Sequence, residues 1–390
     1  MTIDTLIVLC AIAGGIWLVR LSVMVGLLVW RRRLRHGDAE RPTAAETVSI
    51  LIPARNEAAN IRACLESLLN QDYPHIEIIV ADDRSDDGTD RIVEQLAADR
   101  PRLRLLRIGE LEDGWTGKTH ALHKAAAEAT GDVLLFTDAD TLHSPDNVRR
   151  VLARMQRKGL DMASLLTAMI TRSFWEHVLQ PVMGGMLMVQ FPLVLVNRKK
   201  GLAFSNGQYI MIRREAYETI GGHASVKHCL LEDVAMAREA KRHGLDVEVI
   251  LGQHLTRVRM YTGFEQIWRG WSRIFYAGFQ GSAPRLLLGI LLIVWLGFFP
   301  WACLIAGLGM LAGGATQGAA PLTIVAACTL AIQHASLGSF FALAGCRVRY
   351  LVFYPVAAVV GIGVLTNALW TSLKGGSIRW RGTDYAAKNA

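Results

Sequence analysis

The sequence has 390 residues, of which 52% are hydrophobic and only 19% are charged, and its mean hydropathy is +0.27. These values exclude a disordered or collagen-like chain and disfavour an ordinary soluble enzyme. The formal net charge of +8 is typical of a membrane protein whose Lys and Arg flank its spans on the cytoplasmic side. The basic residues form no stripe within a recognisable nucleic-acid-binding module, so we expect no nucleic-acid partner.

The first apolar stretch covers residues 6–30, and Arg20 is the one charged residue inside it. It is long enough to span a bilayer, and a basic cluster follows it at residues 31–35. A cleaved signal peptide is the alternative, but no basic segment precedes the apolar run. We therefore expect a transmembrane anchor at residues 1–30 and a basic juxtamembrane linker at residues 31–46.

The C-terminal third is also apolar, because residues 286–373 contain only two charged residues, Arg347 and Arg349. Its pattern predicts three transmembrane helices, at residues 286–311, 321–344 and 350–373. Four spans would place the basic tail (residues 374–390) outside, against the positive-inside rule, so a re-entrant last segment is the alternative. The sequence thus predicts a multi-pass protein of the cytoplasmic (inner) membrane.

The middle of the chain reads as an α/β domain, at residues 47–275. Short apolar runs predict strands, and amphipathic stretches between them predict helices. The expected strands are residues 48–53, 76–81, 103–108 and 132–137, and the expected helices are residues 58–70, 89–98 and 118–129. This alternation predicts a mostly parallel sheet, in which ligands bind beyond the carboxyl ends of the strands.

Acidic residues follow two of these strands. Asp138 and Asp140 come after the last strand, and two such carboxylates can bind Mg²⁺ or Mn²⁺ together with a diphosphate. Asp82 and Asp83 end the second strand, and either could accept hydrogen bonds from a nucleotide base or ribose, as could Glu57. The alternative for each group is a solvated turn, and residues 86–89 fit a turn with a helix cap.

Two further motifs have a chemical and a structural interpretation. Glu232 and Asp233 precede a helical stretch, so Asp233 is either a general base for an acceptor hydroxyl or a helix cap. Gln266, Arg269 and Trp271 lie just before the second span, so they either form a membrane-interface belt or stabilise a departing diphosphate.

Residues 178–196 are apolar but are interrupted by two prolines and two glycines. They could form a fifth span. We prefer an interfacial or re-entrant segment, because the acidic motifs on either side of it must share one compartment if they act together.

These motifs together resemble the membrane-bound family 2 glycosyltransferases, which have the GT-A fold. The resemblance covers residues 48–273 and rests on Pro53-x-x-Asn56-Glu57, Asp82-Asp83, Asp138-x-Asp140, Glu232-Asp233 and Gln266-x-x-Arg269-x-Trp271. The stretch at residues 114–118 and the tail at residues 378–385 are similar to those of hopanoid-associated, carotenoid and ceramide glucosyltransferase-like lipid glycosyltransferases. One departure is Gly270, which separates Arg269 from Trp271 where the family has Arg-Trp, and it puts the role of Trp271 in doubt.

The resemblance implies an inverting transfer from a UDP-sugar to a hydroxyl of a membrane lipid at the cytoplasmic face. The lipid would be a ceramide, a hopanoid, a carotenoid or a similar molecule. The implied roles are nucleotide-sugar binding by Pro53, Glu57, Asp82, Asp83, Lys118 and Asp138, metal binding by Asp138 and Asp140, base catalysis by Asp233 with Glu232, and leaving-group stabilisation by Gln266, Arg269 and Trp271.

Three alternatives remain open from the sequence. A polysaccharide synthase would use its spans as a polymer channel, and a polyprenyl-phosphate sugar transferase would differ only in its acceptor. The non-enzyme alternative is a membrane scaffold whose soluble domain binds a nucleotide.

Overall fold

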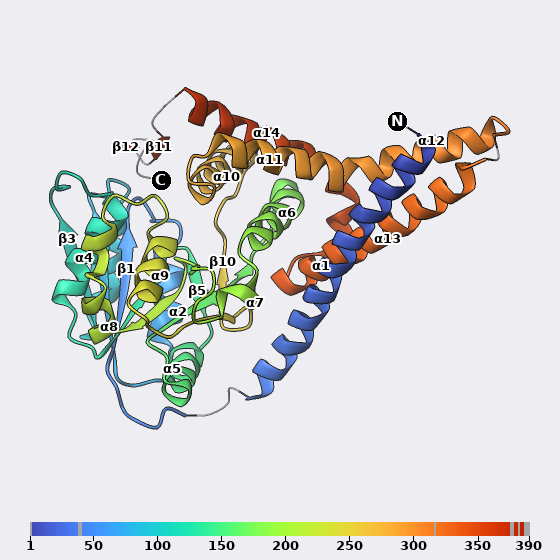
Figure 1. The fold of residues 1–390 in the computed structure, drawn as a ribbon. Coiled ribbons are helices and arrows are strands. Elements are labelled where there is room, and N and C mark those ends of the chain that lie inside the picture. The colour runs from blue at the N-terminus through green and yellow to red at the C-terminus, as the bar shows by residue number, and fades with distance from the viewer. Residues whose placement is uncertain (1, 38–40, 316, 375–377, 381–382, 386–390) are drawn as a thin grey trace.

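The computed structural model describes residues 2–37, 41–315, 317–374, 378–380 and 383–385 (Figure 1). Part of the expected linker (residues 38–40) and most of the expected tail lie outside this range. The chain forms an α/β domain on one side and an array of long apolar helices on the other.

A seven-stranded sheet forms the α/β domain, in the order β3-β2-β1-β4-β8-β6-β9. All neighbouring pairs are parallel except those of β8, which is antiparallel to both β4 and β6. The expectation of a mostly parallel α/β sheet is therefore confirmed. The strands are β1 (Val48–Ala54), β2 (Ile76–Asp83), β3 (Leu103–Ile108), β4 (Val133–Phe136), β6 (Met162–Leu166), β8 (Ile210–Arg213) and β9 (Val247–Leu251).

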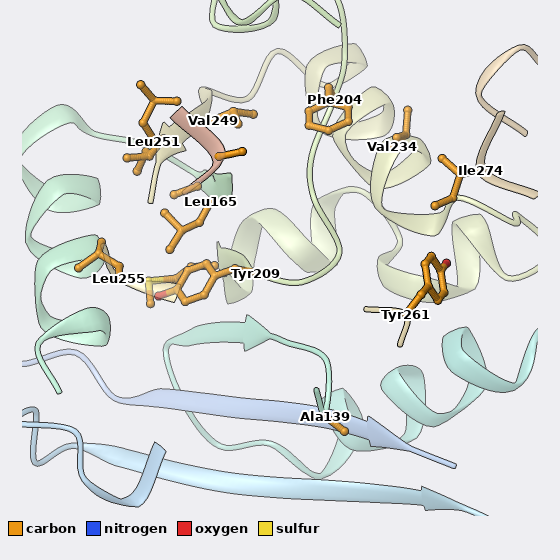
Figure 2. Close-up of a cluster of buried hydrophobic side chains, with 14 of the residues drawn as sticks. Ala139, Leu165, Phe204, Tyr209, Val234, Val249, Leu251, Leu255, Tyr261 and Ile274 are labelled. Carbon is orange, nitrogen blue, oxygen red and sulfur yellow. The ribbon is translucent and has the colours of Figure 1, made fainter. Parts of the chain in front are cut away.

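Helices cover both faces of this sheet, which is why its central strands are apolar runs without alternation. In β1, Ile50 and Ile52 join one buried cluster with α2, and Leu51 joins a second cluster with α4. Figure 2 shows part of the first cluster, where Leu165 and Leu255 lie beside Tyr209. The helices and turns of this domain are α2 (Ile61–Leu69), α3 (Thr89–Ala97), α4 (Gly117–Glu128), α5 (Asn147–Lys158), α8 (Arg214–Thr219), η1 (Gly222–Val226) and α9 (Glu232–Arg242).

A small second sheet lies beside the first and has the order β5-β10-β7. Its strands are β5 (Thr141–His143), β7 (Ala168–Met169) and β10 (Thr256–Val258). It positions the segments that lead to α6 (Phe174–Gln190), α7 (Leu193–Val196) and α10 (Phe264–Gly278). Helix α6 packs against α10, α13 and α14, so it joins the α/β domain to the apolar helices.

Four segments in the described part of the chain are long and apolar enough to cross a membrane: Ile3–Trp30, Ala283–Ala312, Ala319–Ala344 and Val348–Leu373. They match the four expected spans. Residues 178–196 are not among them, because α6 has 17 residues and buries the polar side chains of Glu176, His177 and Gln180. The elements are α1 (Ile3–Gly37), α11 (Ala283–Ile293), η2 (Val294–Phe298), α12 (Phe299–Ala312), α13 (Ala319–Ala344), η3 (Val348–Phe353) and α14 (Tyr354–Leu373), and a short hairpin follows as β11 (Ile378–Trp380) and β12 (Thr383–Tyr385).

Candidate active site

The carboxyl ends of β1, β2 and β4 meet at one edge of the sheet. Ala54 of β1 pairs with Asp82 of β2, and Leu51 of β1 pairs with Phe136 of β4. The loops after these strands therefore open into a single cavity of about 1410 Å³. It is lined by the predicted site residues Pro53, Glu57, Asp83, Lys118, Asp138, Asp140, Glu232, Asp233, Gln266, Arg269 and Trp271.

The two aspartates that end β2 have different surroundings. Both are buried, but only Asp83 lines the cavity, since successive strand residues point to opposite faces. The Asp83 carboxylate pairs with Arg84 Nε at 2.8 Å and with Arg55 Nη1 at 3.4 Å. Asp82 Oδ2 instead accepts a hydrogen bond from the Ser85 backbone N–H at 3.3 Å. Asp83 is therefore the better candidate for contact with a nucleotide.

The segment at residues 86–89, where the sequence fits a turn with a helix cap, ties two loops of the site together. Asp87 Oδ1 accepts hydrogen bonds from Thr89 N at 3.0 Å and from Thr89 Oγ1 at 2.6 Å. Its Oδ2 accepts from Ala58 N at 2.9 Å. Glu57 follows β1 in the same loop, and its Oε2 accepts from Asn60 Nδ2 at 2.9 Å.

Lys118 connects the two acidic motifs that the sequence separates by about ninety residues. Its Nζ lies 2.7 Å from Asp138 Oδ1 and 2.8 Å from Glu232 Oε1. Burial disfavours the ammonium ion, but these two carboxylates outweigh burial and raise the pKa of Lys118. The side chain starts in the first turn of α4, which approaches β2 closely because Gly117 has no Cβ: an added Cβ would lie 2.5 Å from Asp83 Oδ2. Lys118 is a fixed cation at the centre of the site.

Asp140 has the features of a metal ligand. Its Oδ1 is buried and has no hydrogen-bond partner. Burial and the nearby carboxylates of Asp138 and Glu57 raise the pKa of Asp140 to about 8. No cluster of three or more His, Cys, Asp or Glu side chains with metal-binding geometry occurs among the described residues. Asp138 and Asp140 would supply the carboxylates, and substrate phosphates would complete the ligands, which is how Mg²⁺ usually binds.

A buried network that the sequence did not reveal holds the turn of the Asp138-x-Asp140 motif. Thr141 Oγ1 donates to the Asp138 carbonyl at 2.7 Å, and His143 Nε2 lies 2.9 Å from Thr141 Oγ1. Burial lowers the pKa of His143 to about 3, so the ring is neutral at pH 7. The available signal was the polar pair Thr141 and His143, one and three positions after Asp140, but burial cannot be read from one sequence.

Asp233 lies in the first turn of α9, one residue after the helix begins, and the N-cap is Leu231. Asp233 Oδ1 accepts from Val234 N at the start of α9, and its Oδ2 accepts from Gly207 N, each at 2.8 Å. Burial and the neighbouring Glu232 raise the pKa of Asp233 to about 6. A carboxylate with a pKa near the working pH is suited to general base catalysis.

The three predicted residues of α10 point to different places. Gln266 Oε1 accepts from Thr262 N at 3.0 Å, and Trp271 Nε1 donates to Gln180 Oε1 of α6 at 2.9 Å. Arg269 pairs with Glu265, and its side chain is 72% exposed. These contacts place Trp271 in the packing between α10 and α6, and they place Arg269 at the rim of the cavity.

Arg273 is the second arginine of the segment at residues 266–273. It lies one turn after Arg269 and lines the cavity. Its charge helps to lower the pKa of Glu232, where burial acts in the opposite direction and Lys118 contributes more. Arg273 is therefore a second cation beside the acidic site.

The glycine that separates Arg269 from Trp271 has a steric role. A Cβ on Gly270 would lie 2.1 Å from Cζ of Tyr261, so the Tyr261 ring packs directly on the backbone of α10. Only glycine permits this contact without a shift of the helix.

The sheet has acidic loops around a cavity at its carboxyl edge, and residues 49–221 match the glycosyl transferase family 2 model. This match and the relatives described next class the chain as a glycosyltransferase.

The similar proteins agree with this class. The chain is 28% identical to the 4,4'-diaponeurosporenoate glycosyltransferase of Staphylococcus aureus (strain N315) over 287 residues, which are 72% of this chain and 73% of that protein. It is also 28% identical to the enzyme of the same name from Staphylococcus haemolyticus over 284 residues, 71% of this chain and 73% of that protein. The fold is similar to that of a mannosyltransferase from Pyrobaculum calidifontis, solved with GDP-Man and Mn²⁺, with a TM-score of 0.53, 21% identity and coverage of 94% of this chain and 99% of that chain.

Proposed function

We propose that the protein is an inverting glycosyltransferase that moves a sugar from a UDP-sugar to a hydroxyl group of a membrane lipid at the cytoplasmic face. One observation supports this most directly. The cavity that contains Lys118, Asp140 and Asp233 is continuous with a wall of apolar side chains from α1, α6 and α11. A water-soluble donor and an apolar acceptor can therefore meet in one space.

The donor would bind at the sheet edge. Asp83 and Glu57, beside Pro53, would hold the nucleoside, and Asp82 would support the loop after β2. Asp138 and Asp140 would hold Mg²⁺ or Mn²⁺, which when bound offsets the charge of the diphosphate. Lys118 and Arg273 add fixed positive charge beside the same group, and Arg269 with Gln266 would act from the rim.

The acceptor hydroxyl would approach from the membrane side. Asp233 takes its proton while the acceptor oxygen attacks the anomeric carbon. The bond from that carbon to the diphosphate oxygen breaks, and UDP leaves with the electron pair. One displacement of this kind inverts the anomeric configuration. Glu232 keeps the Asp233 carboxylate basic by charge repulsion, and Lys118 keeps Glu232 ionised.

The acceptor class is proposed from the relatives and the cavity together. The staphylococcal relatives are named for a carotenoid, a long apolar lipid. The membrane side of the cavity contains Met186 and Leu187 from α6, Phe191 just after it, and Leu288 and Leu292 from α11. We propose that the acceptor is a carotenoid-type, hopanoid or ceramide lipid. We also propose that the enzyme crosses the inner membrane several times.

The test measures nucleotide release by the detergent-purified full chain with Mg²⁺ or Mn²⁺. It uses a panel of UDP- and GDP-sugars, with and without a total lipid extract, and Asp233→Asn as the matched variant. We expect UDP release that needs metal and lipid and that is lost in the variant. Release unaffected by lipid would reject the lipid acceptor. Release that needs lipid but persists in the variant would favour a phosphate acceptor, which has little need of a base.

A further inference from the structure

A half-buried arginine lies in the membrane part of the cavity. Arg20 is on α1 within the candidate span Ile3–Trp30, and about 15 Å of helix separates it from Trp30 at 1.5 Å per residue. Trp17, Arg20, Val23, Met24 and Leu27 all line the cavity. Their spacing of three and four residues places them on one side of α1, so Arg20 faces the cavity and not the bilayer.

The protein does not neutralise this charge. The guanidinium carbon of Arg20 lies 5.1 Å from the centre of the Trp17 ring, and its Nη1 is buried without a hydrogen-bond partner. Among the described residues no Asp or Glu forms an ion pair with Arg20. Charged residues within membrane spans are costly and usually mark a substrate site.

The neighbouring helix approaches the guanidinium group closely. Gly185 of α6 has no side chain, and a Cβ there would lie only 3.2 Å from Arg20 Nη2. Phe340 of α13 lies next to the same position, 3.4 Å away. Neither Gly185 nor Phe340 offers the guanidinium group a negative charge, so an anionic ligand would have to supply it.

We propose that Arg20 binds an anionic group of the lipid acceptor, so that the acceptor is an apolar lipid with a carboxylate or phosphate group. This inference rests on the proposed function, since it specifies the lipid of that reaction. A neutral lipid would leave the charge buried and unpaired, whereas an anion forms charge-assisted hydrogen bonds with the planar guanidinium group. Arg20 is a positioning residue here and takes no part in bond making.

The first experiment measures binding without turnover. The detergent-purified full chain is labelled with a photoactivatable, alkyne-tagged palmitic acid or with the matching alcohol, and labelled peptides are located by mass spectrometry. In the wild type we expect about tenfold more labelling by the acid, on peptides of α1 and α6, which corresponds to one moderate charge contact. Arg20→Gln should reduce acid labelling to the level of the alcohol, and Arg20→Lys should keep most of the preference.

Arg285→Gln is the matched control, because it removes a cation from the same cavity. Arg285 is exposed at the start of α11, and its Nη1 already donates to Gln280 Oε1 at 2.7 Å. The Arg285→Gln variant should prefer the acid probe over the alcohol probe as strongly as the wild type does. A preference for the acid that survives in Arg20→Gln, or no preference in the wild type, would overturn the proposal.

The second arm separates the acceptor from an anionic phospholipid of the bilayer. Displacement of the acid by phosphatidylglycerol vesicles but not by phosphatidylcholine vesicles would assign Arg20 to a bilayer lipid and overturn the proposal. In the transfer assay, Arg20→Gln should raise the KM for the lipid acceptor about tenfold and leave the KM for the donor unchanged. If no lipid accepts sugar even with the wild type, the proposed function fails, while the labelling still decides whether Arg20 binds an anion.

Discussion

The two ends of the cavity differ in how their charges are arranged. At the sheet edge, carboxylates outnumber cations, and Lys118 holds two of them at 2.7 and 2.8 Å. At the membrane end the walls are apolar, and Arg20 is a cation without a carboxylate partner in the described part of the chain. The first end suits a metal-bound diphosphate, and the second suits a lipid. Donor and acceptor can therefore be separated by charge within one cavity.

The strongest test of the sheet-edge end is Asp233→Asn. We expect transfer to a hydroxyl acceptor to fall by about 10²–10⁴-fold, because the variant cannot take the proton. The wild-type kcat/KM should decline below about pH 6, since Asp233 must be ionised and its pKa is raised to about 6. Glu232→Gln removes the neighbouring negative charge, so the pH below which kcat/KM declines should become lower. If kcat/KM declines at the same pH in Glu232→Gln as in the wild type, the assignment of Asp233 as the base is contradicted.

Asp140→Asn tests the metal at the same end. We expect transfer to fall by about 10³-fold, as for the loss of one strong electrostatic contact to the transition state. Mn²⁺ should raise the melting temperature of the wild type, since a ligand stabilises the folded state that binds it, but not that of the variant. Asp86→Asn is the control, because Asp86 is an exposed turn residue. Equal Mn²⁺ stabilisation of all three proteins would argue against this site.

Lys118→Gln tests the cation that links the two acidic motifs. We expect about 10²-fold slower transfer and partial recovery in Lys118→Arg, which keeps the charge but not the compact ammonium. Lys124 lies six residues further along α4 and pairs with Glu112, so Lys124→Gln should behave as the wild type. A Lys118→Gln enzyme with normal donor affinity and rate would show that the link is structural only.

Apolar residues in and just after α6 test the membrane end. Serine at Met186, Leu187 or Phe191 should raise the KM for lipid about tenfold and leave the KM for the nucleotide sugar unchanged, because each side chain contributes apolar contact area. Val194→Ser is the control, since Val194 is 55% exposed and lies outside the cavity wall. Equal effects on both substrates would remove the distinction between the two ends.

The smallest effect is expected at the contact between Gly270 and Tyr261. Gly270→Ala should lower stability by about 1–3 kcal/mol through its clash with the Tyr261 ring. The same change in a Tyr261→Ala background should cost less, and thermal unfolding of the four proteins measures this coupling. Additive losses would show that the clash is not the cause.

The sequence predicted the sheet edge well because its signals are local. Apolar runs mark β1, β2 and β4, and the acidic residues follow them directly, so their meeting at one edge follows from parallel pairing. The four apolar spans follow from length and composition. Strand β8, with four residues antiparallel to its neighbours, has no comparable signal.

Contacts between distant segments could not be predicted. The double pairing of Lys118 depends on how α4 and α9 approach each other, and sequence spacing does not contain that distance. Arg269 and Arg273 share a helix face, and only the packing of α10 shows which lies deeper. Arg20 was visible as a charge in an apolar run, but the rotation of α1 about its axis depends on its neighbouring helices.

The most direct test of the central claim is mass spectrometry of the lipid product. The purified full chain is incubated with its UDP-sugar, metal and lipid extract, beside Asp233→Asn. We predict an apolar lipid that gains the mass of one sugar residue, formed by the wild type and absent with the variant. A polymer, a water-soluble product or a sugar on a polyprenyl phosphate would contradict this account.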